Sequence, residues 1–155
     1  MSGPSIVKCR LSLALLLLLA PKVANAAGTT CTLSASGVAF GTYNPLSAAP
    51  NNATGTVTLR CNPRLASTAR ISLSTGGGSS YAGRRMTSGS ASLPYQLYLD
   101  SARSRIWGDG TGGSSFDTES GSASQVIITV YGQIAPNLAL IPGSYTDTIT
   151  ATVVY

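Results

Sequence analysis

Three acidic residues lie close together in the second half of the sequence and are the first candidates for chemistry: Asp109, Asp117 and Glu119. Paired carboxylates are the catalytic groups of glycoside hydrolases, and carboxylate oxygens on a turn can bind calcium. All three lie in a segment rich in glycine and serine, where acidic residues are common turn formers. We therefore predict no catalytic residue, no cofactor and no metal site. Calcium binding by residues 109–113 with Asp117 and Glu119 stays open, although the spacing departs from the EF-hand pattern.

Nucleophilic catalysis is disfavoured by composition. The sequence has no histidine, which removes Ser-His-Asp and Cys-His arrangements. Both lysines, Lys8 and Lys22, lie in the N-terminal leader described below, so a Ser-Lys pair is also excluded. The glycines at residues 76–78 are not followed by the Lys-Ser/Thr of a phosphate-binding loop. We predict that the protein is not an enzyme.

Trp107 stands beside the same acidic loop and suggests a binding role. A tryptophan ring can serve as a platform on which a sugar stacks, and with Asp109 it would form a surface-binding loop. The alternative is that Trp107 packs over the open end of the fold, and we favour that packing role.

The first 26 residues have the organisation of a secretory signal peptide. Lys8 and Arg10 precede a ten-residue apolar run at 11–20, and residues 24–26 form an A-x-A cleavage site. The run is too short to cross a bilayer, which takes about 20 residues, although an uncleaved membrane anchor is the alternative. We predict cleavage after Ala26, which leaves one secreted domain of residues 27–155 without a transmembrane segment.

Removal of this leader also changes the charge of the chain. Seven arginines and five acidic residues remain, so the net charge falls from +5 to +2. The arginines form only two close pairs, Arg84 with Arg85 and Arg103 with Arg105, whereas a nucleic-acid-binding protein presents a dense basic face. We interpret these arginines as solvated loop residues and predict no nucleic-acid binding.

Two cysteines, Cys31 and Cys61, remain after the predicted cleavage. An even pair in an exported chain predicts one disulfide. Two free thiols or a metal site are the alternatives, and the sequence lacks the CxxC and histidine of a zinc site.

Short alternating apolar patterns, separated by Gly, Pro, Asn and Ser turns, predict an all-β domain. We expect about seven strands packed as a sandwich, with Val57, Leu59 and Cys61 facing inward from one of them. The clearest strands cover residues 31–40, 53–61, 70–74, 93–99, 125–134 and 144–155.

The last of these strands reaches the final residue of the sequence. Ile149, Ala151, Val153 and Tyr155 form its apolar face and alternate with threonines. Because an exposed apolar strand edge promotes aggregation, we expect a partner to cover it. An ordinary final strand with inward alternation is the alternative.

Several segments in this order resemble the spore coat protein U domain family, which is shared with the subunits of archaic chaperone–usher pili. The resemblance covers residues 31–155, and its specificity comes from the ordered set rather than from any single motif. The segments are FGTYNP at 40–45, GTVTLRC at 55–61, LSTG at 73–76, RM at 85–86, LPYQLY at 93–98, WGDGT at 107–111, VYGQI at 130–134 and GSYTDT at 143–148, with the C-terminal aromatic residue.

This resemblance implies an incomplete immunoglobulin-like β-sandwich that lacks its final strand. A periplasmic chaperone lends a strand to the resulting groove and holds the C-terminal strand, which is residues 149–155 here. At the outer-membrane usher, an N-terminal extension of the next pilus subunit replaces the chaperone strand. The resemblance also implies a disulfide between Cys31 and Cys61, transit through the periplasm to a fimbria on the cell surface, and a role in attachment and biofilm formation.

The N-terminus departs from the family pattern. Only residues 27–30 lie between the predicted cleavage site and Cys31, and four residues span roughly 14 Å at about 3.4 Å each. They lack alternating bulky side chains, so we expect this subunit to accept a strand but not to donate one, as at a fibre tip. The alternatives are a non-fibrous spore or cell-surface coat protein of the same fold, and a secreted carbohydrate-binding module.

Overall fold

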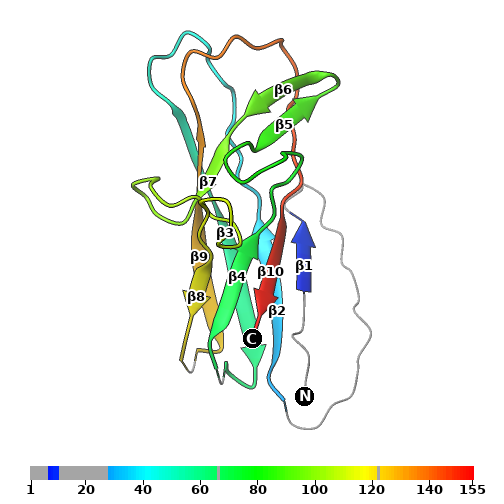
Figure 1. The fold of residues 1–155 in the computed structure, drawn as a ribbon, viewed down its shortest axis with the longest axis vertical. Helices are drawn as coiled ribbons and strands as arrows, with labels where there is room; N and C mark the ends of the chain where they lie inside the picture. Colours follow the sequence, from blue (N-terminus) through cyan, green and yellow to red (C-terminus); the bar gives the residue numbers. More distant parts are fainter. Residues whose placement is uncertain (1–6, 11–27, 66, 122) are drawn as a thin grey trace.

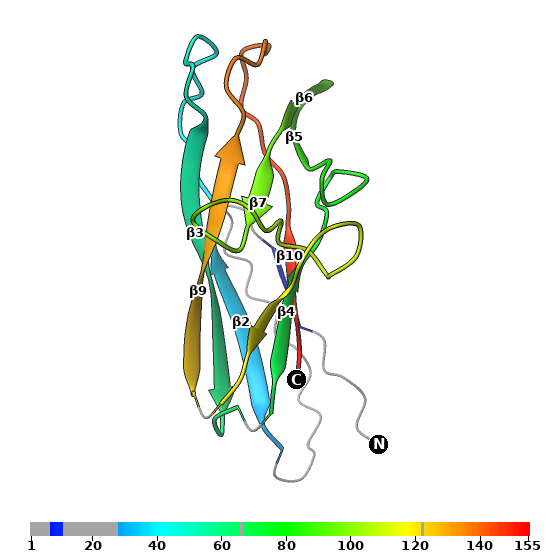
Figure 2. The same ribbon diagram turned by 60° about the vertical axis from the view of Figure 1, so that its left-hand side comes forward.

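The computed structural model describes residues 7–10, 28–65, 67–121 and 123–155. Within these residues the regular elements are ten β-strands, and no helix is long and apolar enough to cross a membrane. Two four-stranded antiparallel sheets form a sandwich, which Figure 2 shows nearly edge-on. The first sheet has the order β1 (Val7–Arg10), β10 (Thr150–Val154), β4 (Ala69–Leu73) and β8 (Asp117–Glu119). The second has the order β2 (Thr30–Ser36), β3 (Asn51–Asn62), β9 (Gln125–Ile134) and β7 (Gln96–Tyr98).

A short hairpin of β5 (Arg85–Ser88) and β6 (Ala91–Pro94) projects from one end of the sandwich (Figure 1). The all-β sandwich expected from the sequence is confirmed, but about seven strands is an underestimate. The additional elements are strands of three or four residues, which are too short to produce a clear alternating pattern, and β1, which lies within the predicted leader.

The core lies between the two sheets and follows the period-two alternation of the strands. The predicted inward residues of β3 are confirmed, since Val57, Leu59 and Cys61 are buried. Ile71 and Leu73 of β4 meet them from the opposite sheet. β9 has the predicted bounds and is rich in β-branched residues. It pairs with β3 at ten positions.

The strand predicted at residues 93–99 is divided in two. β6 pairs with β5, whereas β7 pairs with β9 in the second sheet. Pro94 has no N–H to continue a ladder, and the Tyr95 N–H donates to the Arg84 carbonyl oxygen at 3.2 Å. Leu93, Tyr95 and Leu97 nevertheless alternate across this break, and all three side chains are buried.

The final strand is also shorter than predicted, since β10 begins only at Thr150. In the preceding segment the Thr148 N–H donates to the Asp147 carboxylate at 2.7 Å instead of to a neighbouring strand. Thr146 forms a single bridge to Thr87 of β5. Residues 144–149 therefore lead into β10 as an extended segment without a regular ladder, and a single bridge joins them to the hairpin.

Candidate functional site

The edge of β10 is the first feature of the candidate site. On one side β10 pairs with β4, with Ala151 opposite Leu73 and Val153 opposite Ile71. On its other side it pairs with β1, in a register that runs from Val7 opposite Val153 to Arg10 opposite Thr150. Figure 1 shows β1 antiparallel to β10 at the outer edge of the sheet. The strand that completes this edge therefore comes from the segment that the sequence predicts to be a cleaved leader.

An apolar groove lies beyond the N-terminal end of β10, beside the segment that leads into this strand. Its volume is about 800 Å³. One wall consists of residues 37–43, which follow β2, and the other of residues 140–147. The floor is formed by core side chains, which include Leu93, Tyr95, Leu97, Ile134 and Ile149.

One carboxylate fixes the second wall of the groove. Asp147 accepts hydrogen bonds from the Tyr95 hydroxyl at 2.6 Å and from the Gly77 N–H at 2.8 Å. Burial raises the pKa of Tyr95 far above its usual range, and the hydrogen bond to Asp147 raises it further. Gly76 has a φ of +64°, and a Cβ there would lie within 2.8 Å of Asp147 and Ile149 side-chain atoms, so this turn requires glycine.

The C-terminal residues singled out in the sequence lie along this site. Ile149, Ala151 and Val153 are buried and point into the core, while Tyr155 is half-buried. The Cys31 N–H donates to the Tyr155 hydroxyl at 3.0 Å, which ties the chain end to the start of β2. A partner at this edge would therefore meet the backbone of β10, and contact with a chaperone stays a prediction.

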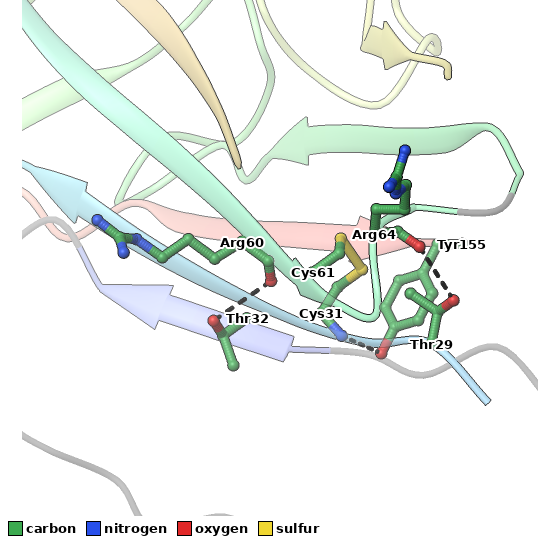
Figure 3. Close-up of a disulfide and its surroundings, with 7 residues drawn as sticks. All are labelled: Thr29, Cys31, Thr32, Arg60, Cys61, Arg64 and Tyr155. Carbon is green, nitrogen blue, oxygen red and sulfur yellow. Dashed lines mark hydrogen bonds between the residues drawn. A yellow bond between two sulfur atoms is a disulfide. The ribbon is translucent and has the colours of Figure 1, made fainter. Parts of the chain in front are cut away.

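The predicted disulfide is confirmed. Cys31 and Cys61 are directly opposite each other on β2 and β3, with Cα atoms 4.1 Å apart. Figure 3 shows the ring of Tyr155 beside this bond. The disulfide thus fixes the start of β2 to the end of β3, and the Tyr155 hydrogen bond holds the residue after β10 beside it.

The proposed role of Trp107 in binding sugar is wrong, and the packing role is correct. Its side chain is fully buried, and its indole N–H donates to the Ile71 carbonyl oxygen at 3.1 Å. No ligand can stack on a ring in that position. Asp109 remains accessible, and its Oδ1 accepts hydrogen bonds from the N–H and the hydroxyl of Thr111.

Arg84 is a structural residue that the sequence interpretation missed. We expected a solvated arginine, but its side chain is 1% exposed. The guanidinium donates to the carbonyl oxygens of Ser74 and Trp107 and to Oε1 of Gln96, at 2.6 to 3.2 Å. Burial lowers its pKa. Arg85, its neighbour in sequence, is exposed as expected.

Asp109, Asp117 and Glu119 do not come together as one group of three ligands. Asp117 and Glu119 occupy alternate positions of β8, whereas Asp109 lies in the preceding loop. Burial raises the pKa of Glu119, and the neighbouring Asp117 carboxylate raises it further. The described residues contain no group of three or more His, Cys, Asp or Glu side chains that could hold a metal ion.

The family assignment follows from the sequence comparison. The sequence model of the spore coat protein U domain matches residues 18–152. The chain belongs to this family. The resemblance stated from the ordered motifs is thereby confirmed, and it extends over nearly the whole sandwich. No curated protein matches the spore coat U chain at a significant level.

A solved structure shows the same fold. The crystal structure of the CsuC-CsuE chaperone-tip adhesion subunit pre-assembly complex, from archaic chaperone-usher Csu pili of Acinetobacter baumannii, matches with a TM-score of 0.57 and 20% sequence identity. The match covers 82% of the spore coat U chain and 40% of the matched chain. At 20% sequence identity, this likeness shows the fold of the chain.

Proposed function

We propose that this spore coat U chain is an exported subunit of a chaperone–usher type surface pilus, and that its β10 edge and apolar groove accept a strand from a partner. In the periplasm the partner is a chaperone, and in the fibre it is a neighbouring subunit that replaces the chaperone at the usher. The subunit acts in attachment and is not an enzyme.

The observation that carries this proposal is the source of β1. The edge of β10 is completed by residues 7–10, which lie in the predicted leader. Cleavage after Ala26 would remove this strand and leave the backbone groups of Thr150–Val153 without that partner. The groove of about 800 Å³ lies beside residues 140–147, which continue the same edge. A single extended strand from another chain could pair with β10 and fill the groove with alternate side chains.

We further propose that the subunit stands at the distal end of the fibre. Only residues 27–30 separate the predicted cleavage site from Cys31, and Cys31 is tied to β3 by the disulfide. This segment has no alternating apolar side chains for a neighbouring groove. Such a subunit receives a strand without passing one on.

The test is to supply the missing strand within the same chain. β1 runs antiparallel to β10, so a donor strand placed after Tyr155 can reach the same position through a short turn. A donor strand of about ten residues, at roughly 3.4 Å per residue, would run along β10 from Val153 to the groove. We expect residues 27–155 with this donor to form a monomer that melts well above the same residues without it, because a tethered strand acts at roughly millimolar effective concentration.

The matched control is a donor of identical composition whose apolar residues are shifted by one position. This shift turns every apolar side chain to the solvent face, so the control donor should not raise the melting temperature. Size-exclusion profiles of all three proteins accompany the melting curves. The proposal is wrong if residues 27–155 alone form a stable monomer that neither donor changes, and the non-fibrous coat protein would then be the better assignment.

A further inference from the structure

A second cleft lies on the outer face of the β1-β10-β4-β8 sheet, away from the strand-accepting groove. Its volume is about 400 Å³. Ser72 and Thr152 line it, and they alternate with the buried core residues of β4 and β10, so they face outward. The loop between β7 and β8 lies beside the upper end of β4 (Figures 1 and 2), and its Asp109 forms part of the wall. The complete lining is Ser72, Leu73, Ser74, Tyr81, Asp109, Thr150 and Thr152.

The floor of this cleft is rich in hydroxyl groups. Thr152 is directly opposite Ser72 in the β10–β4 ladder. Two residues after Ser72, the Ser74 hydroxyl oxygen accepts the N–H groups of Thr150 at 2.9 Å and of Gly76 at 3.3 Å, which leaves its own O–H available as a donor. These four side chains are half-buried, so they are fixed by the sheet and still reach the cleft. The hydroxyls of Ser72, Thr150 and Thr152 can each both donate and accept a hydrogen bond.

The wall of the cleft holds an aromatic ring in a defined position. The guanidinium of buried Arg84 lies 5.5 Å from the centre of the Tyr81 ring, and the Gln96 amide donates to the Tyr81 carbonyl oxygen at 2.9 Å. Gly108 packs so tightly that a Cβ there would lie 2.7 Å from a Tyr81 ring carbon. The ring is therefore held in place by the fold, as expected for a preorganised binding surface.

The carboxylate beside this ring is held as firmly. Asp109 closes a turn with Thr111, and its carbonyl oxygen accepts a hydrogen bond from Arg70. The Arg70 guanidinium in turn lies 3.6 Å from the centre of the Phe116 ring. Burial raises the pKa of the Tyr81 phenol, and its hydrogen bond to the Asp109 carboxylate raises it further.

We propose that this cleft binds a neutral saccharide unit. Small-ligand sites have volumes of roughly 300–1,000 Å³ and combine apolar surface with a few fixed polar groups. The hydroxyls of the floor and the Asp109 carboxylate match sugar hydroxyls, which donate and accept hydrogen bonds. The apolar ring of Tyr81 offers a surface on which the C–H groups of a pyranose can pack. A negatively charged sugar is disfavoured, because Asp109 is the charged residue of the lining.

This inference does not rest on the proposed strand exchange. An incoming strand would pair with the backbone edge of β10, whereas the cleft uses the outward side chains of Ser72 and Thr152. A failure of one proposal therefore leaves the other unaffected. Together they would give a surface subunit whose sheet recognises glycans.

The test is binding of free glucose, galactose, mannose, lactose and maltose to the full-length chain, measured by saturation-transfer NMR and titration calorimetry. At least one of these sugars should bind. The Thr152→Val variant keeps the β-branched shape of the side chain and removes one hydrogen bond, so it should weaken binding about fivefold. Asp109→Asn should weaken binding of the same sugar, because the carboxylate forms stronger hydrogen bonds than an amide.

The matched control is Thr58→Val, which changes an outward, half-buried threonine of β3 on the other sheet and should leave affinity unchanged. Melting curves establish that all variants are folded. The proposal is overturned if none of the five sugars binds the folded chain. It is equally overturned if Thr152→Val and Asp109→Asn bind as well as the unmodified protein, since the sugar would then occupy another surface.

Discussion

Replacing Tyr95 with phenylalanine should destabilise the wall of the strand-accepting groove at neutral pH but not at high pH. The Tyr95 side chain is 7% exposed, and its hydroxyl donates to the Asp147 carboxylate at 2.6 Å. A hydrogen bond to a charged group contributes about 2 kcal/mol to the free energy of unfolding. The variant keeps the aromatic ring, and Asp147 retains the N–H groups of Gly77 and Thr148 as donors. The expected loss at pH 7 is therefore about 2 kcal/mol.

The pH dependence follows from the pKa of Tyr95, which burial and then Asp147 raise in the folded state. An unfolded tyrosine has a pKa of about 10. The folded state thus holds the phenol proton more tightly, and its stabilising effect is complete below pH 10. Above pH 10 the unmodified protein loses up to about 1.4 kcal/mol per pH unit through this residue, whereas the Tyr95→Phe variant does not. By about pH 11.5 this loss reaches about 2 kcal/mol, which equals the advantage of the unmodified protein at pH 7, so the two proteins should then be equally stable.

Urea unfolding of the full-length chain at pH 7 to 11.5, followed by fluorescence and circular dichroism, measures this difference directly. The remaining tyrosines are common to both proteins and cancel in the comparison. Tyr98→Phe, on β7, is the matched control for the removal of a phenol and should change stability less at pH 7. Equal stability of Tyr95→Phe and the unmodified protein at pH 7, or a difference that stays constant up to pH 11.5, would refute the role assigned to the Tyr95–Asp147 pair.

Three other outcomes are expected. Replacing both Cys31 and Cys61 with alanine should lower the free energy of unfolding by about 3–4 kcal/mol, because the bond closes a loop with a sequence separation of 30; mass spectrometry of the alkylated, non-reduced protein should find no free thiol in the unmodified domain. Arg84→Met should destabilise by about 3 kcal/mol in urea unfolding because it leaves buried acceptors without a donor, whereas Arg85→Met should change stability by less than about 0.5 kcal/mol. Deleting residues 153–155 should abolish periplasmic accumulation on immunoblots, since it shortens the strand expected to be held by a chaperone; normal soluble levels would contradict that role.

The class of the fold and most of its core could be predicted from the amino-acid sequence alone. Period-two alternation identified the inward residues of β3, because a strand exposes its two faces alternately whatever its neighbours are. The even pair Cys31 and Cys61 indicated the disulfide, since an exported domain that keeps only two cysteines has one possible pairing. The order of short motifs indicated the family, which the match over residues 18–152 confirms.

The ends of the strands and the roles of the polar residues depend on contacts between segments that are distant in sequence. Alternation gives the face of a residue but not its sheet, so the transfer from β6 to β7 at Tyr95 was not visible in the sequence. Arg84 is buried because acceptors from three distant segments converge on its guanidinium, and no local pattern encodes that convergence. The cleft at Tyr81 and Asp109 arises for the same reason, since it joins two strands and two loops that are separate in sequence.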